Sequence, residues 1–176
     1  MRTLIVNTLA GPCGGKTTTC WEIAAALKRR GIVVEYVPEY TKELVYEKNW
    51  VLLDGTLEHQ KEILKEQKHR QDRLYGQVQV ILTDAPLLFN LIYLDNCTEE
   101  YEKEVVDLFN SYNNLNIFVR RNPAEFTQIG RNHNLEESIK KDKEILDFLD
   151  KHDIPFIVYD QKDIDFIVDA IIQCID

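Results

Sequence analysis

The sequence has several shortages, and each of them excludes a class of protein. No apolar run is long enough to cross a bilayer, so we expect no membrane-spanning segment. The four cysteines, Cys13, Cys20, Cys97 and Cys174, form no CxxC pair and no zinc-ligand spacing with histidine. We expect no secretion signal at the N-terminus. We therefore expect reduced thiols and a cytoplasmic protein.

Positive charge is also scarce. The chain has 21 Lys and Arg residues against 30 Asp and Glu residues, and its net charge is -9. Such a chain repels nucleic acid unless a local basic patch overrides the average. Internal repeats, low-complexity tracts and Gly/Ser linkers are absent from the sequence. A length of 176 residues then favours one domain over residues 1–176.

Short apolar runs rich in β-branched residues alternate with segments of helical periodicity. This alternation predicts an α/β fold with a five-stranded parallel sheet and helices on both faces, in three layers. The expected strands are residues 3–9, 32–37, 78–82, 116–119 and 155–159, and the expected helices are residues 16–30, 56–75, 99–112, 135–152 and 163–175.

Glycine is rare, with seven residues in the chain, yet three of them lie in the turn "LAGPCGGKTTTC" between the first strand and the first helix. The turn reads Ala10-x-x-x-x-Gly15-Lys16-Thr17, a phosphate-binding loop with alanine in place of the first glycine. Backbone N–H groups and the helix N-terminus would hold the phosphates of ATP. The predicted nucleotide-binding residues are Gly11, Pro12, Cys13, Gly14, Gly15, Lys16, Thr17 and Thr18. The alternative is a chance glycine turn with a helix N-cap.

Two acidic residues follow predicted strands. Pro38 ends the second strand, which places Glu39 at the edge of the sheet where ligands bind in open α/β folds. Glu39 is a candidate base or positioning group for an acceptor hydroxyl, or else an exposed residue that begins a helix. Asp84 ends the third strand, "VQVILTD". With Thr17 it is predicted to hold Mg²⁺, and the alternative is an N-cap for a helix with Pro86 in its first turn.

The predicted helix 56–75 carries an unusual polar stripe. Gln60, Gln67 and Gln71 fall within its apolar arc, and Arg70 lies at the edge of that arc. Buried amides need partners, and an amide matches the edge of a nucleobase or carboxamide. Gln60, Gln67 and Arg70 are therefore candidate substrate-binding residues. Alternatively, the glutamines face water.

Basic residues gather after the fourth strand. Arg120, Arg121 and Arg131 bracket a Pro- and Gly-containing segment that we expect to form a lid over about residues 120–134. Lid arginines, Arg121 and Arg131 foremost, would neutralise charge on a transferring phosphoryl group. The alternative is a solvated basic loop. In the helix 135–152, Asp142 falls on the apolar stripe, and we expect it to be a paired structural aspartate.

The order of phosphate-binding loop, "PEYTKELV", long polar helix and strand-Thr-Asp resembles the nicotinamide riboside kinase domain of NadR-type proteins. It also resembles the related P-loop nucleoside and nucleotide kinases of many phage genomes. The resemblance implies a P-loop NTPase fold, and a helix 56–75 that flanks the acceptor pocket. It also implies a metal-contacting acid, often one of a pair, where this chain has Asp84 without a second acid.

These observations favour an ATP- and Mg²⁺-dependent kinase that phosphorylates a nucleoside or nucleotide, with Lys16, Glu39, Asp84, Arg121 and Arg131 as its catalytic residues. The expected location is cytoplasmic, in the host cell if the chain is phage-encoded. One alternative is a phage-type kinase that acts on a hydroxymethylated base in DNA. Another is a regulatory protein that binds or hydrolyses nucleoside triphosphates without transferring phosphate to an acceptor.

Overall fold

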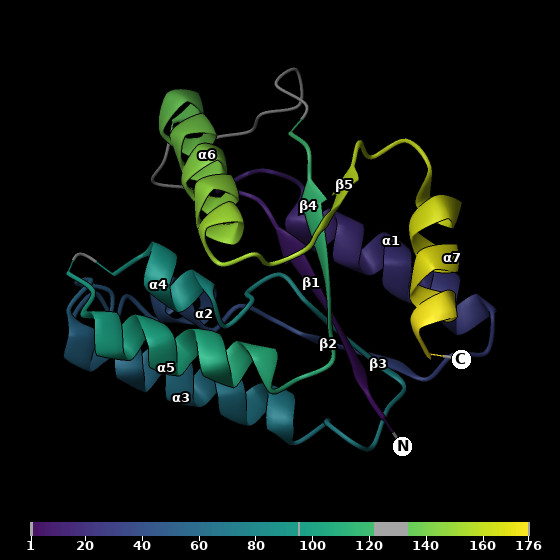
Figure 1. Ribbon diagram of the computed structural model, residues 1–176, viewed down its shortest axis with the longest axis horizontal. Helices are drawn as coiled ribbons and strands as arrows, with labels where there is room; N and C mark the ends of the chain where they lie inside the picture. Colours follow the sequence, from purple (N-terminus) through teal and green to yellow (C-terminus); the bar gives the residue numbers. More distant parts are fainter. Residues whose placement is uncertain (1, 95, 122–133, 176) are drawn as a thin grey trace.

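A computed structural model describes residues 2–94, 96–121 and 134–175. Its centre is a five-stranded parallel sheet with the strand order β2-β3-β1-β4-β5. The chain therefore has the predicted α/β fold of P-loop NTPases (Figure 1). The strands are β1 (Leu4–Leu9), β2 (Val34–Val37), β3 (Val80–Thr83), β4 (Asn114–Val119) and β5 (Ile157–Tyr159).

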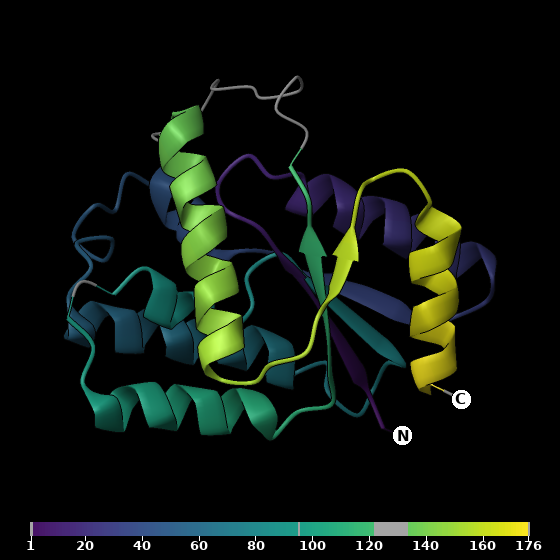
Figure 2. The same cartoon turned by 45° about the horizontal axis from the view of Figure 1, so that its top comes forward.

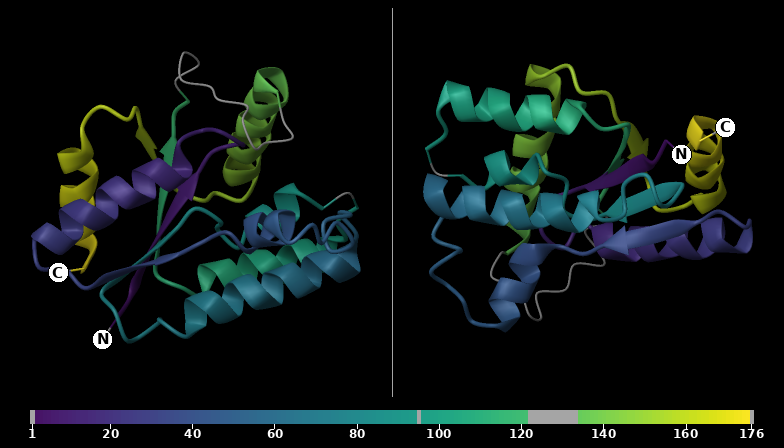
Figure 3. Two further views of the ribbon diagram at one scale, coloured as in Figure 1. Left: turned by 180° about the vertical axis from the view of Figure 1, so that it is seen from behind. Right: turned by 90° about the horizontal axis from the view of Figure 1, so that it is seen from below.

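Of the seven helices in the described residues, six cover the two faces of this sheet, and α2 packs against α3 (Figures 1 and 2). One face carries α1 and α7, which pack against each other as well as against the strands. The other carries α3 to α6, with α3 and α5 side by side in the views of Figure 3. The helices are α1 (Lys16–Arg29), α2 (Tyr40–Tyr46), α3 (Leu57–Asp72), α4 (Phe89–Ile92), α5 (Glu99–Asn110), α6 (Leu135–Lys151) and α7 (Ile164–Ile175).

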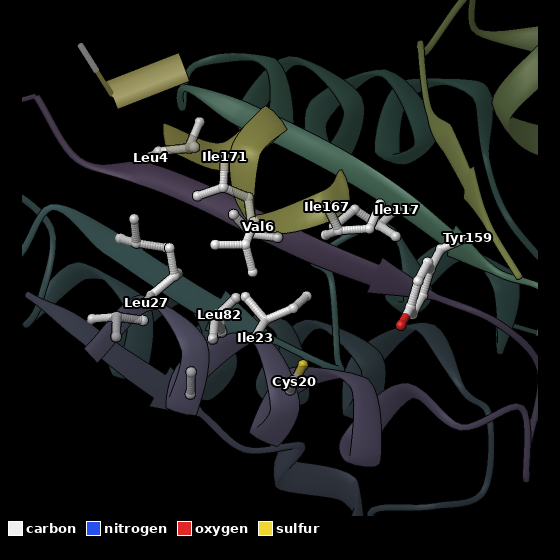
Figure 4. Close-up of a cluster of buried hydrophobic side chains, with 14 of the residues drawn as sticks. Leu4, Val6, Cys20, Ile23, Leu27, Leu82, Ile117, Tyr159, Ile167 and Ile171 are labelled. Atoms are coloured by element: carbon white, nitrogen blue, oxygen red, sulfur yellow. The ribbon is translucent and has the colours of Figure 1, made fainter. Parts of the chain in front are cut away.

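Strand β1 lies in the middle of the sheet, and all six of its residues are buried. Alternate side chains on a strand point to opposite faces. Accordingly Leu4 and Val6 join the core beneath α1 and α7, which Figure 4 shows in close-up, whereas Ile5 and Leu9 face the other helix layer. Continuous burial on both sides explains why this strand reads as an apolar run without alternation.

The parallel arrangement brings the carboxyl ends of all five strands to one edge of the sheet, where open α/β folds bind ligands. The glycine-rich turn follows β1, and Glu39 lies two residues beyond β2. Asp84 directly follows β3, and Arg121 lies two residues beyond β4. The topology therefore gathers the predicted site residues at one edge although they are far apart in the sequence.

The structure also corrects some local predictions. The expected elements all form, with ends shifted by a few residues. Two short helices, α2 and α4, were not among the expected elements, although helices after Glu39 and after Asp84 were considered as alternatives. Pro86 precedes α4 and lies outside any helix, and the N-cap of α4 is Leu88, so the interpretation of Asp84 as a helix cap is wrong. Among the described residues, no helix is long and apolar enough to cross a membrane.

Candidate phosphate and acceptor site

The glycine-rich turn forms a tight loop whose backbone requires small residues. Gly15 has a φ of 88°, in the left-handed region, and it precedes α1 without any side-chain cap. The N-cap residue therefore makes no side-chain hydrogen bond to the first N–H groups of α1. Those N–H groups can bind an anion at the N-terminus of the helix. At Gly14, a Cβ atom would stand 2.4 Å from the Cβ of Ala10. Alanine at the first motif position is accommodated because Gly14 has no side chain.

Lys16 is folded back over the loop. Its Nζ atom donates hydrogen bonds to the carbonyl oxygens of Ala10 at 2.9 Å and Gly11 at 3.2 Å. The same ammonium group lies 5.5 Å from the centre of the Phe89 ring. Lys16 therefore connects the phosphate loop to the region beyond β3, where Phe89 begins α4.

Thr17 and Asp84 meet at the start of α1. The Thr17 hydroxyl donates to Asp84 Oδ2 at 2.5 Å. Asp84 is 2% exposed, and its other oxygen, Oδ1, has no hydrogen-bond partner among the described residues. A buried carboxylate oxygen without a partner beside a threonine hydroxyl fits Mg²⁺, which prefers oxygen ligands and keeps several of its waters. The predicted metal-binding pair is thus placed together.

Tyr36, on β2, is a neighbour of this pair that sequence reasoning missed. Burial, and then the charge of Asp84, raises the pKa of the Tyr36 hydroxyl. The hydroxyl consequently stays protonated at neutral pH and remains a hydrogen-bond donor. The sequence held one indication that Tyr36 lies near Asp84. Tyr36 is the next-to-last residue of β2, and β2 ends at the same edge of the sheet as β3.

A cavity of about 200 Å³ lies between the β2–α2 turn, α3 and the segment after β3. Glu39 lines it, and the Glu39 Oε1 atom accepts a hydrogen bond from the Thr41 hydroxyl at 2.5 Å. Glu39 is also the N-cap residue of α2, as the alternative interpretation from the sequence had it. Phe89 lines the same cavity and contacts Lys16. The cavity therefore approaches the phosphate loop through Phe89.

The glutamine stripe of α3 faces inward as predicted, and the interpretation that it faces water is wrong. Gln60, Gln67 and Gln71 are all buried, and the first two line the cavity. Both ends of the Gln67 amide bind backbone, with Oε1 accepting from Tyr40 N at 3.0 Å and Nε2 donating to Pro38 O at 3.2 Å. Gln67 thus fixes the turn that presents Glu39.

Gln60 belongs to a buried hydrogen-bond network. Its Oε1 atom accepts from Asn90 Nδ2 at 2.9 Å, and Asn90 Oδ1 accepts from the Tyr101 hydroxyl at 2.6 Å. Asn90 also lines the cavity. Because the carbonyl end of the Gln60 amide is used by Asn90, the amide nitrogen is the Gln60 group that a ligand can engage. Asn90 and Tyr101 were missed from the sequence, since no spacing rule links them to α3.

Arg70 does not line the cavity. It forms two hydrogen bonds of 2.7 Å with the Glu43 carboxylate and one of 2.7 Å with Glu66. Its guanidinium lies 4.6 Å from the centre of the Tyr40 ring, and Tyr40 lines the cavity. The structure thus places Arg70 behind the cavity wall, where it supports Tyr40.

The arginines after β4 differ from one another. Arg120 is 62% exposed at its side chain and pairs with Asp160. Arg121 is 5% exposed and pairs with Asp142 of α6, so Asp142 is the paired aspartate that the sequence predicted. Arg131 and most of the predicted lid lie outside the described residues.

Comparisons with known proteins agree with the fold described above. Residues 9–165 match the AAA_28 family of AAA domains, and the chain belongs to that family. No curated protein matches the chain by sequence. The fold is that of P-loop nucleoside and nucleotide kinases.

Three solved structures illustrate the likeness. Thymidylate kinase from Ehrlichia chaffeensis has a TM-score of 0.63 and 14% identity, with 100% of each chain covered. NadR protein in complex with NR has a TM-score of 0.64 and 17% identity, covering 97% of this chain and 51% of that chain. Deoxyadenosine kinase from M. mycoides with bound dATP has a TM-score of 0.51 and 17% identity, with 98% of each chain covered. At these identities the likeness establishes the fold.

Proposed function

We propose that the protein is an ATP-dependent kinase that phosphorylates a hydroxyl group of a nucleoside. The observation that carries this proposal is the position of the cavity. It adjoins the phosphate loop through the contact between Lys16 and Phe89, and it has the Glu39 carboxylate on its wall. A site for triphosphate and a site for a small acceptor thus share one edge of the sheet.

The proposed reaction is a single phosphoryl transfer. The acceptor hydroxyl forms a bond to the γ-phosphorus, the bond between that phosphorus and the β–γ bridging oxygen breaks, and ADP leaves. The hydroxyl proton passes to Glu39, or Glu39 orients the hydroxyl while the proton leaves by another path. Lys16 leaves its loop carbonyls to stabilise the β- and γ-phosphates. Mg²⁺, when held by Thr17 and Asp84, would supply neutralisation of phosphate charge.

The charge of the cavity favours an acceptor without a phosphate group. Among the described residues that line it there is no lysine or arginine, and Glu39 is the one carboxylate. An acceptor phosphate in this cavity would meet a negative charge without a basic partner. By contrast, the rings of Tyr40, Phe89 and Tyr93 suit a flat base, and the Gln60 amide suits its edge. A nucleoside therefore fits better than a nucleotide.

The two alternatives remain testable. A base within DNA would need a basic surface around the cavity, which a net charge of -9 disfavours. Salt-dependent binding of hydroxymethylated DNA would support that alternative. A regulatory NTPase would hydrolyse ATP at a rate that no acceptor changes.

A screen of acceptors tests the proposal. The purified protein would be incubated with ATP, Mg²⁺ and single nucleosides, nucleoside monophosphates or nicotinamide riboside, and ADP formation would be measured. We expect at least one nucleoside to accelerate ADP formation well above the rate with ATP alone, and its monophosphate to have no effect. Acceleration by monophosphates alone would contradict the nucleoside assignment, and a rate independent of all acceptors would contradict the kinase assignment.

A further inference from the structure

A second polar cluster lies against the phosphate loop. Asp142 of α6 accepts hydrogen bonds from Gly11 N at 2.6 Å through Oδ1 and from Arg121 Nε at 2.9 Å through Oδ2. Arg121 Nη2 also lies 3.3 Å from Asp142 Oδ1. A single carboxylate thus ties together the phosphate loop, the end of β4 and helix α6.

The cluster is closely packed against the loop. A Cβ atom on Gly11 would lie 2.6 Å from the carbonyl oxygen of Ser138 and 3.0 Å from Asp142 Oδ1. A Cβ atom on Gly14 would lie 3.5 Å from Arg121 Nη2. Glycine at position 11 therefore allows α6 to approach the loop backbone, and the Arg121 guanidinium lies against the loop itself.

Arg121 has a hydrogen-bonding group without a partner. Its side chain is 5% exposed, and Nη1 has no hydrogen-bond partner among residues 2–94, 96–121 and 134–175. Leaving a charged donor buried and unpaired is costly, so such a group points to a ligand that supplies the acceptor. Because Nε and Nη2 are engaged by Asp142, the planar guanidinium can turn only if that ion pair breaks.

Asp142 alone would harm nucleotide binding, since a carboxylate beside the phosphate loop repels phosphate. Pairing with Arg121 neutralises that charge and leaves Nη1 as the remaining donor. We propose that Asp142 is a positioning residue of the phosphate site, which fixes Arg121 so that Nη1 donates to a phosphate oxygen of the nucleotide in the loop. This inference rests on the proposed function, because it requires a nucleotide in the loop.

Calorimetric titration with ATP·Mg²⁺ and with inorganic triphosphate tests this role in a double-mutant cycle. The proteins are the wild type, Asp142→Asn, Arg121→Gln and the double variant. Asparagine retains an oxygen that can accept from Gly11 N but removes the charge pairing with Arg121. We expect each single variant to bind both ligands about tenfold or more weakly, because a charge-assisted hydrogen bond is lost. We also expect the double variant to bind no more weakly than Arg121→Gln, because Asp142 acts through Arg121.

Controls separate this role from a structural one. Asp147→Asn makes the same charge change on an exposed position of α6 and should bind as the wild type does. If Asp142→Asn fails to fold, Arg121→Lys replaces it, since lysine keeps the charge but lacks the fork that binds Asp142, and a similar loss of affinity is expected.

Two results would overturn the inference about Asp142 but leave the proposed function standing. The first is a wild-type affinity for both ligands in Asp142→Asn or in Arg121→Lys. The second is a loss of affinity in the double variant equal to the product of the losses in the two single variants. A wild-type protein that binds neither ATP nor triphosphate would overturn the proposed function as well.

Discussion

The phosphate loop and the acceptor cavity are built in different ways. The loop is one continuous segment of the chain, and the groups that we propose to bind phosphate and metal there are backbone N–H groups together with Lys16 and Thr17. The cavity is assembled from side chains of the β2–α2 turn, α3 and the segment after β3. We conclude that the proposed site for the triphosphate donor depends on local backbone geometry, whereas the proposed site for the acceptor depends on tertiary packing. Changes in the two regions should therefore have separable effects.

The largest effect is expected at the loop. Lys16→Ala should reduce phosphoryl transfer by about a thousandfold or more, since it removes the charge that stabilises the transferring phosphoryl group. Turnover would be measured with the acceptor that the screen identifies, and circular dichroism would show that the fold is retained. Near-normal turnover in a folded variant would contradict the assignment of the loop.

The second largest effect distinguishes the acceptor cavity from the phosphate loop. Glu39→Gln should lower kcat by about 10²–10⁴-fold, because an amide can neither take the hydroxyl proton nor orient it as the carboxylate does. The dissociation constant for ATP, measured by calorimetry, should stay within about twofold of the wild-type value. Glu47→Gln, an exposed position at the end of α2, is the matched control and should change neither quantity. An unchanged kcat in Glu39→Gln would remove Glu39 from the reaction.

A smaller effect is expected from the network behind the cavity. Tyr101→Phe removes the hydroxyl that donates to Asn90 Oδ1 and leaves that buried oxygen unpaired, which costs about 1–3 kcal/mol of stability. Because Asn90 holds Gln60, KM for the acceptor should rise several-fold while KM for ATP stays unchanged. Tyr46→Phe, at an exposed position, should leave both values unchanged. An equal rise in both KM values would contradict the separation of the two regions.

The smallest effect concerns the pair that supports Tyr40. Hydrogen bonds from Arg70 lower the pKa of Glu43 below its ordinary value of 4.5. A carboxyl with a lowered pKa in the folded state stabilises the protein above its ordinary pKa, and that stabilisation is lost as the pH falls through the folded-state pKa. Since Glu43 is partly exposed, the contribution is at most about 1 kcal/mol. Thermal unfolding of Glu43→Gln should therefore differ from the wild type at pH 7, and the difference should shrink as the pH falls below 4.5 and through the folded-state pKa.

A matched variant sharpens that last measurement. Glu62→Gln removes an exposed carboxylate of α3 that has no ion-pair partner among the described residues. It should show no loss of stability at pH 7. A difference between Glu43→Gln and the wild type that stays constant as the pH falls below 4.5 would contradict the role of the ion pair with Arg70.

The same contrast explains what the sequence could predict. The strands, the long helices and the phosphate loop follow from apolar periodicity and local spacing, so the positions of residues 10–18 after β1 and of Asp84 after β3 could be predicted without the structure. The inward direction of Gln60 and Gln67 also followed from helical periodicity. Their partners did not, because Asn90, Tyr101 and the Pro38–Tyr40 backbone reach them only through tertiary packing. Arg70 was placed at the cavity by its position on α3, but its side chain turns to Glu43 and Glu66.

Transfer of labelled phosphate tests the central claim most directly. The protein would be incubated with Mg²⁺, ATP labelled in its γ-phosphate and the nucleoside selected by the screen, and the products would be separated and identified by mass. The account predicts that the label appears on a hydroxyl of the nucleoside, that ADP forms in equal amount, and that Lys16→Ala forms neither product. Label found only in free phosphate, at a rate that the nucleoside does not change, would contradict it.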